Sequence, residues 1–317
     1  MRVVFMGTPD FAVGTLTALA EAGHEIVGVV SQPDKPKGRG KALMPTPVKE
    51  EALRLGLPVY QPRRVREESF VETLRSLHPD VIVVAAFGQI IPESILTLAP
   101  LGCVNVHASL LPRYRGAAPI QWAVIDGEEE SGVTIMQMDA GLDTGDMIAK
   151  VTVPIAPEET GGSLFDKLSQ AGARLLVETL PSLENHTAVF EKQPQESPTA
   201  YAGMIRKEMG NLDWKLPALR LERLIRGLNP WPSAYTFLGK KSLKLWRAQV
   251  LENVSGQDAP AGTVLQADAG GFLVQTGDGI LKILELQLEG KKRMDAEAFL
   301  RGCQIPAGTV LTQNRQE

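Results

Sequence analysis

An asparagine and a histidine two residues apart have the clearest chemical potential in this sequence. Asn105 and His107 lie at the end of the apolar stretch that begins at Cys103. On an extended strand, side chains two residues apart point to the same side of the sheet. An amide donor and an imidazole on one side can stabilise an oxyanion and transfer a proton in one transition state. The alternative is that His107 is a hydrogen-bonded structural histidine, and both interpretations stay open.

A carboxylate in a glycine-rich segment is the third candidate. Asp143 lies in the sequence Asp-Ala-Gly-Leu-Asp-Thr-Gly-Asp at 139–146, which follows an apolar run at 133–138. The glycines permit a tight backbone path. The carboxylate can orient His107, favour its charged form and relay protons through water. A solvated acidic turn is the alternative, whereas the spacing does not fit a calcium-binding loop.

This chemistry requires strands that bring the three residues to one edge of a sheet. Short apolar runs alternate with helical patterns through the first half of the chain, which predicts a Rossmann-like, doubly wound, mostly parallel α/β sheet. Ligands of such sheets bind beyond the carboxyl ends of the strands. The expected strands are 2–6, 25–31, 81–86, 103–106 and 133–138, and the expected helices are 11–22 and 48–55.

The pattern changes near residue 190. Residues 191–198 are polar and contain two prolines, so we expect a catalytic domain at 1–190, a linker at 191–205 and a second domain at 206–317. A helix at 217–228 is predicted to open the second domain. Period-two segments with Gly-rich turns then predict a small C-terminal β-barrel of the OB type. These segments are 233–238, 242–248, 262–267, 271–276 and 279–288.

Two basic regions indicate a polyanionic partner. Residues 206–317 carry 16 Lys or Arg against 12 Asp or Glu, whereas the rest of the chain carries 17 against 25. In the segment 31–49, Pro and Gly disfavour regular structure and predict a mobile basic loop. Trp246, among the basic residues of the barrel, is interpreted as half-buried packing. The candidate phosphate contacts are Lys35, Lys37, Arg39 and Lys41 in the loop, and Lys244, Arg247, Lys291, Lys292 and Arg293 in the barrel. Solvated charged surface is the alternative in both regions.

Composition and missing motifs exclude several classes. With 44% hydrophobic and 22% charged residues, the chain has the composition of a folded globular protein. The two cysteines, Cys103 and Cys303, lack metal-ligand spacing, so we expect no disulfide, no metal site and a reducing, cytoplasmic setting. No apolar stretch approaches the roughly 20 residues needed to span a bilayer, and the first residues lack a signal-peptide pattern. Residues 7–14 lack G-x-G-x-x-G, which disfavours a dehydrogenase.

Four motifs resemble those of the methionyl-tRNA formyltransferase family, and the likeness covers nearly the whole chain. N-V-H-A-S-L-L-P-R-Y-R-G-A-A-P-I-Q from Asn105 and M-D-A-G-L-D-T-G from Met138 look like its signatures. Glycinamide ribonucleotide and amino sugar nucleotide formyltransferases share this core, so these two motifs indicate folate-dependent formyl transfer and leave the acceptor open. F-M-G-T-P-D-F-A from Phe5, Q-P-D-K-P-K-G-R-G-K from Gln32 and the barrel favour the tRNA-acting family.

The resemblance implies a monomeric enzyme that transfers a formyl group from 10-formyltetrahydrofolate to the amino group of methionyl initiator tRNA, for translation initiation. It places Asn105 and protonated His107 at the formyl oxygen, and we assign to Asp143 the holding of His107 and the relay of protons. It further implies that the segment at 32–41 reaches the acceptor stem while the barrel holds the tRNA. The folate site that it implies is lined by Ser109, Leu110, Leu111 and Pro112, with Phe87 and Gly88 nearby.

Two rival functions remain. A formyltransferase acting on a small amine, such as an amino sugar nucleotide, would need neither the basic loop nor the basic barrel. An RNA-binding protein without enzymatic activity would leave Asn105, His107 and Asp143 at strand ends without explanation.

Overall fold

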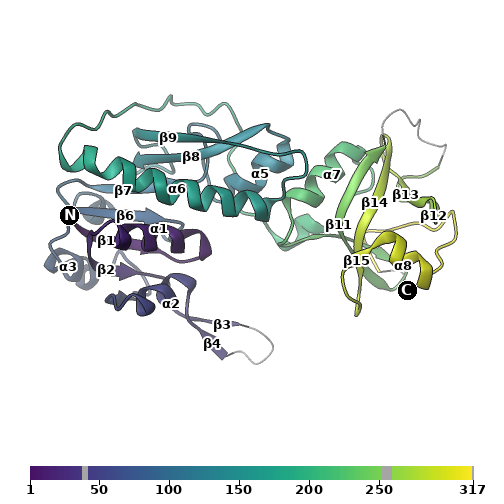
Figure 1. Ribbon diagram of the computed structural model, residues 1–317, viewed down its shortest axis with the longest axis horizontal. Coiled ribbons are helices and arrows are strands. Elements are labelled where there is room, and N and C mark those ends of the chain that lie inside the picture. The colour runs from purple at the N-terminus through teal and green to yellow at the C-terminus, as the bar shows by residue number, and fades with distance from the viewer. Residues whose placement is uncertain (38–41, 252–258, 316–317) are drawn as a thin grey trace. The chain divides into compact units, whose positions relative to one another are not determined.

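The chain folds into two compact units (Figure 1). The computed structural model describes residues 1–317 apart from 38–41, 252–258 and 316–317. Unit 1 comprises Met1–Pro119, Glu130–Pro154 and Phe165–Ala202, and unit 2 comprises Ile120–Glu129, Ile155–Leu164 and Gly203–Glu317. The first part of the expected linker, residues 191–202, therefore belongs to unit 1.

A seven-stranded sheet forms the centre of unit 1 (Figure 1). Its strands are β1 (Arg2–Gly7), β2 (Glu25–Val30), β5 (Val59–Tyr60), β6 (Val81–Ala85), β7 (Cys103–His107), β8 (Glu130–Gln137) and β9 (Met147–Pro154). The order is β5-β2-β1-β6-β7-β8-β9. The first five strands in this order, β5, β2, β1, β6 and β7, pair in parallel. Strand β8 pairs antiparallel with both β7 and β9. The predicted Rossmann-like, mostly parallel sheet is confirmed.

Helices cover both faces of this sheet, because its central strands are apolar on both sides. They are α1 (Asp10–Glu21), α2 (Pro47–Arg54), α3 (Glu68–Ser76), α4 (Glu93–Leu96) and α6 (Gly161–Glu184). Val4 and Met6 of β1 share a buried cluster with side chains of α3 and α4. On the opposite face, a Cβ added at Gly7 would lie 2.7 Å from the Cβ of Ala12 in α1, and one added at Gly172 of α6 would lie 2.8 Å from Val106. The sheet is thus doubly wound, as predicted.

The basic segment after β2 is more regular than predicted. β3 (Lys35–Lys37) and β4 (Ala42–Met44) form an antiparallel hairpin in which Pro36 is paired with Leu43. Both strands of a two-stranded hairpin are edge strands, where a proline breaks no central ladder. The prediction of an irregular loop is therefore wrong for these two strands. Residues 38–41 lie outside the described residues.

An antiparallel sheet forms unit 2. Its strands are β10 (Ala234–Leu238), β11 (Lys241–Leu251), β12 (Val264–Asp268), β13 (Gly271–Gln275), β14 (Ile280–Leu288) and β15 (Met294–Asp295). Helices α7 (Ala218–Gly227) and α8 (Ala296–Gly302), the 3₁₀ helix η1 (Lys207–Gly210) and most of α5 (Pro119–Asp126) also belong to this unit. The strand order is β10-β11-β14-β13-β12, with β15 on β14. The predicted helix and all five predicted strands are present.

The C-terminal segment joins the two ends of this sheet. Phe237 of β10 pairs with Thr312, and Thr263, just before β12, pairs with Val310. Phe272 is fully buried inside the resulting barrel. The expected small C-terminal barrel is therefore confirmed. Within the described parts of the chain, no helix is long and apolar enough to cross a membrane.

Candidate active site

Strand β7 carries two of the three predicted catalytic side chains. Asn105 pairs with Val84 of β6 and Met136 of β8, and His107 pairs with Thr134 of β8. The pleat places Asn105 and His107 on the same side of the strand, as expected. His107 is only 6% exposed, while Asn105 is half-buried. Both lie at the carboxyl end of a central parallel strand, where ligands of such sheets bind.

The imidazole of His107 is held between a backbone carbonyl and a carboxylate. Its Nε2 lies 3.1 Å from the carbonyl oxygen of Tyr114, and since a carbonyl only accepts, Nε2 carries the proton in this contact. Its Nδ1 lies 3.7 Å from Oδ1 of Asp143. The structure therefore brings His107 and Asp143 together, although they are far apart in the sequence.

Asp143 and Asp139 have different tasks in the glycine-rich segment. Asp139 closes the turn, because its carboxylate accepts hydrogen bonds from the Gly141 N–H at 3.0 Å and from the Thr144 hydroxyl at 2.8 Å. Asp143 points instead toward His107, and its Oδ2 accepts from the Gly116 N–H at 2.9 Å. An acidic turn was the alternative interpretation of this segment, and Asp139 is the residue that forms it.

The backbone of Asp143 is in the left-handed region, with φ of 55°. For a residue with a side chain this conformation costs roughly 1–2 kcal/mol, although Asp tolerates it better than most residues. Such a conformation persists where surrounding contacts hold it. Two of these contacts come from Gln193, whose side-chain amide donates to the carbonyl oxygens of Asp143 at 2.9 Å and Gly145 at 2.7 Å.

The predicted folate-site residues lie along the segments that follow β6 and β7. Ser109 and Leu111 are 1% exposed and Phe87 is 2% exposed, whereas Leu110 and Pro112 are half-buried and Gly88 is exposed. The hydroxyl of Thr134, which the sequence analysis did not single out, donates to the Ser109 carbonyl at 2.7 Å and accepts from the Leu111 N–H at 3.0 Å. The segment at 109–111 is therefore held by the Thr134 hydroxyl of β8.

Polar side chains connect the ends of β1, β2 and β6. The Thr8 hydroxyl donates to the Phe87 carbonyl at 2.8 Å, and the Gln32 amide donates to the Gly88 carbonyl at 2.9 Å. Gly88 has φ of 83°, and an added Cβ would lie 2.6 Å from the Gln32 amide nitrogen. A glycine is favoured at this position because of its backbone conformation, and a larger residue would also displace the Gln32 side chain.

The base of the basic hairpin is an internal network. The Asp34 carboxylate accepts from Lys49 Nζ at 2.6 Å and from the Gln61 amide at 2.7 Å. These hydrogen bonds, Gln61 first and then Lys49, lower the pKa of Asp34. Lys49, which adds to the positive charge of this segment, is thus paired at the base. Of the four predicted phosphate contacts here, Lys35 is exposed, Lys37 lies in β3 without a described side chain, and Arg39 and Lys41 lie outside the described residues.

The two basic clusters of the barrel meet at one tryptophan. Lys244 Nζ lies 5.5 Å and the Arg293 guanidinium carbon 4.7 Å from the Trp246 ring centre. Trp246 is half-buried, as interpreted. Arg293 also forms a double hydrogen bond with Glu285, at 2.5 and 2.6 Å, and Arg247 lies 3.8 Å from Asp295. Carboxylates thus partly neutralise this surface.

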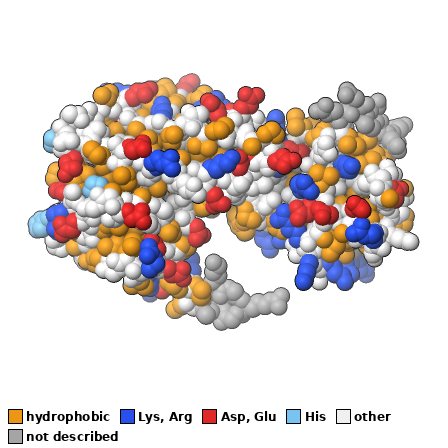
Figure 2. Space-filling view, viewed as in Figure 1, with side chains coloured by type: hydrophobic (Ala, Val, Ile, Leu, Met, Phe, Trp, Pro, Cys, Tyr) orange, Lys and Arg blue, Asp and Glu red, His pale blue; other side chains and the backbone are white. Residues whose placement is uncertain are grey.

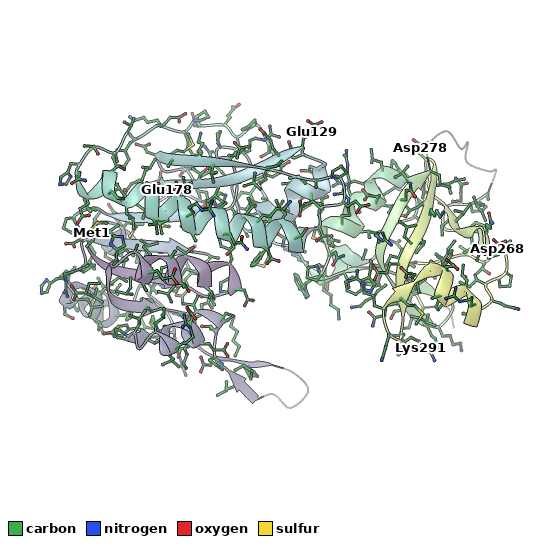
Figure 3. All side chains as sticks on the ribbon, viewed as in Figure 1. Met1, Glu129, Glu178, Asp268, Asp278 and Lys291 are labelled. Carbon is green, nitrogen blue, oxygen red and sulfur yellow. The ribbon has the colours of Figure 1, made fainter. Side chains whose placement is uncertain are left out.

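The remaining predicted contacts, Lys291 and Lys292, are exposed after the end of β14. Figure 3 shows Lys291 at an outer edge of unit 2. On the face in Figure 2, acidic side chains lie among the basic ones of this unit. Among the described residues, no group of three or more His, Cys, Asp or Glu side chains is arranged to hold a metal ion.

Two segments of the chain match models of known domain families. Residues 1–180 match the formyl transferase family, and residues 204–304 match the formyl transferase C-terminal domain. With the Rossmann-like sheet, these matches define the chain as a formyl transferase, an enzyme.

Comparison with full-length relatives narrows the family. The chain is 57% identical over 312 residues to the methionyl-tRNA formyltransferase of Agathobacter rectalis. This match covers 98% of this chain and 100% of that protein. It is 56% identical to the methionyl-tRNA formyltransferase of Lachnospira eligens, with 98% and 99% covered. This chain belongs to the methionyl-tRNA formyltransferase family.

A solved structure shares the fold at low identity. WlaRD, a sugar 3N-formyl transferase, superposes with a TM-score of 0.66 at 18% identity, covering 92% of this chain and 99% of that one. At this identity the likeness establishes the fold alone.

Proposed function

We propose that this enzyme transfers the formyl group of 10-formyltetrahydrofolate to the free amino group of methionyl initiator tRNA, for translation initiation. The observation that carries the proposal is that Asn105 and His107 lie on one side of β7 at its carboxyl end, with Asp143 beside His107. The full-length relatives named methionyl-tRNA formyltransferases support the choice of acceptor. We further propose a cytoplasmic monomer that uses no metal ion.

Asn105 and His107 stabilise negative charge on the formyl oxygen. The reduced folate supplies the formyl group, bonded to its N10 atom. Among the described residues the Asn105 side chain has no hydrogen-bond partner in the protein, so its amide is free to donate to that oxygen. Protonated His107 places a positive charge beside the same oxygen. Because His107 is buried, this charge is screened less than it would be in water.

Asp143 handles the protons. The attacking methionyl amine must be neutral and loses a proton as its new bond to the formyl carbon forms. The Asp143 carboxylate accepts this proton, and the His107–Asp143 pair returns one to the leaving nitrogen, so that protons balance. The 3.7 Å between Nδ1 of His107 and Oδ1 of Asp143 keeps both groups within reach of a shared proton path through water.

Basic side chains in the two units bind the tRNA through its phosphates. In unit 1, the hairpin after β2 carries the charges toward the acceptor end, and the Asp34, Lys49 and Gln61 network fixes its base. In unit 2, Lys244 and Arg293 flank Trp246. Phosphate contacts of this kind add affinity without reading sequence. The proposed contacts are Lys35, Lys37, Arg39, Lys41, Lys244, Arg247, Lys291, Lys292 and Arg293.

The test is the rate of formylation by purified protein with 10-formyltetrahydrofolate and three parallel acceptors. These are methionylated initiator tRNA, methionylated elongator tRNA and an amino sugar nucleotide. We expect rapid transfer to the initiator tRNA alone. Transfer only to the sugar would overturn the proposed acceptor while keeping the catalytic residues. tRNA binding without transfer to any acceptor would overturn the enzymatic proposal.

A further inference from the structure

One glutamine connects the segment after α6 to the candidate active site. Gln193 donates from Nε2 to the carbonyl oxygens of Asp143 and Gly145, at 2.9 and 2.7 Å. Its Oε1 accepts two hydrogen bonds from the Arg115 guanidinium, at 3.0 Å from Nε and 2.9 Å from the terminal nitrogen Nη2. Both ends of the Gln193 amide are therefore engaged, which fixes the orientation of the amide.

Arg115 fixes the position of Gln193. The Arg115 side chain is buried, with the residue 8% exposed, and it also donates to the carbonyl oxygens of Pro194 at 2.8 Å and Gln195 at 3.1 Å. The planar guanidinium presents its donors in a rigid fork, so these acceptors are held in one geometry. Residues 193–195 are thus fastened to the segment that follows β7.

Gly116, which follows Arg115 in the chain, holds the carboxylate of Asp143. The Gly116 N–H donates to Oδ2 of Asp143 at 2.9 Å. Arg115 therefore holds the Asp143 backbone through Gln193, while Gly116 holds the Asp143 carboxylate directly. This double attachment accounts for the left-handed backbone of Asp143, with φ of 55°, because strained conformations persist only where several contacts determine them.

We infer that Gln193 is a positioning residue for formyl transfer, which acts through Asp143 and does not touch the reacting atoms. Its two donated hydrogen bonds hold the backbone at Asp143 and Gly145, and so set the distance between the Asp143 carboxylate and His107. A displacement of about 1 Å in a reacting group can cost about 100-fold in rate. The inference rests on the proposed function, because it requires Asp143 to take part in the reaction.

The decisive variant is Gln193→Glu. A glutamate keeps the size of the side chain and still accepts from Arg115, but it donates to neither carbonyl oxygen. We expect kcat for methionylated initiator tRNA to fall about 10- to 100-fold, with KM for the tRNA changed by less than about twofold. Gln195→Ala is the matched control. Its side chain is exposed and only its backbone carbonyl accepts from Arg115, so we expect kcat to change by less than about twofold.

A double-mutant cycle with Asp143→Asn separates positioning from general structural support. Single-turnover rates are measured with excess enzyme, and circular dichroism and thermal unfolding establish that each variant is folded at the assay temperature. If Gln193 acts through Asp143, Gln193→Glu lowers the rate about 10- to 100-fold in the native background and less than about twofold in the Asp143→Asn background. An equal loss in both backgrounds would indicate structural support alone and would overturn the inference.

Two further outcomes distinguish this inference from the proposed function. If Asp143→Asn loses activity while Gln193→Glu retains it, the positioning role fails and the proposed reaction stands. If Asp143→Asn keeps full activity, the proposed role of Asp143 fails, and the positioning role fails with it.

Discussion

The Nδ1 atom of His107 lies 3.7 Å from Oδ1 of Asp143, which is near enough for charge attraction and too long for a direct hydrogen bond. The other ring nitrogen lies 3.1 Å from the Tyr114 carbonyl oxygen. The backbone after β7 therefore contacts one ring nitrogen, while the Asp143 carboxylate faces the other.

Replacement of His107 by Gln is predicted to separate orientation from charge. A glutamine amide can donate to the Tyr114 carbonyl as Nε2 does, but it carries no positive charge and transfers no proton. We expect kcat to fall about 10²- to 10⁴-fold, the usual range for loss of an acid–base group. The tRNA affinity, measured by filter binding, should stay unchanged because His107 is buried.

His107→Ala serves as the comparison, since it removes the ring contact as well. We expect it to be at least as inactive as His107→Gln and equally able to bind tRNA. Turnover at the native rate in either variant would remove His107 from the mechanism.

The placement of Asn105 and His107 on β7 could be predicted because strand geometry is local. Because Asn105 and His107 are two residues apart, their side chains lie on the same side of the strand. The polar residues that follow the apolar run mark the carboxyl end of the strand. Asp143 could be assigned because another apolar run precedes its segment. The contact of Gln193 with Asp143 could not be predicted, since the two residues are 50 positions apart and Gln193 lies in a polar, proline-containing stretch typical of a linker.

Two elements, β9 and α6, were not predicted because their residues show no clear strand or helix pattern. Strand β9 is a half-exposed edge strand with little apolar content on one side. Helix α6 begins at Gly161 and Gly162 and contains Pro181, which are residues that disfavour helices unless tertiary packing supports them. The sequence predicted such elements poorly because their stability comes from contacts with distant segments.

Removal of two exposed lysines of the barrel is predicted to weaken tRNA binding in a salt-dependent way. Lys291 and Lys292 are exposed after β14. If each contacts a phosphate, the Lys291→Ala/Lys292→Ala variant should bind tRNA more weakly and reduce the slope of log affinity against log salt by about two. Affinity would be measured by filter binding across a salt series, for initiator and elongator tRNA alike.

The matched control for these lysines is Arg75→Ala. Arg75 lies in the last turn of α3 and pairs with Glu72 of the same helix. It should leave the salt slope unchanged. If the double lysine variant also keeps the native slope, these residues belong to ordinary solvated surface.

Cys103 is predicted to resist thiol reagents in the native protein. It is fully buried at the start of β7, and burial raises the pKa of its thiol to about 12. At pH 8 only about one molecule in ten thousand would then carry the reactive thiolate. A colorimetric disulfide reagent should label Cys303, which is half-buried, and reach Cys103 only in denaturant. Rapid labelling of a Cys303→Ser variant without denaturant would contradict this prediction.

Glu51 is predicted to make the stability of unit 1 depend on pH below about 4.5. Hydrogen bonds, first from Arg54 and then from Thr17, lower the pKa of its carboxyl from 4.5 to about 2. A carboxyl whose pKa is lower in the folded state stabilises the fold above its unfolded pKa, and this contribution disappears as the pH falls through the folded pKa. Arg54 lies in α2 with Glu51, whereas Thr17 belongs to α1, so protonation of Glu51 weakens an ion pair within α2 and a contact between the two helices.

The measurement is the free energy of unfolding by urea, for the native protein and for Glu51→Gln, at several pH values from 7 to 2. The native protein should be more stable by a constant amount above pH 4.5, and the difference should shrink steadily toward pH 2 as Glu51 gains its proton. Glu72→Gln is the control, because Glu72 pairs with Arg75 on the exposed surface of α3, where such pairs contribute little. A difference for Glu51→Gln that stays constant down to pH 2 would mean that the carboxylate charge contributes nothing to stability through Arg54 and Thr17.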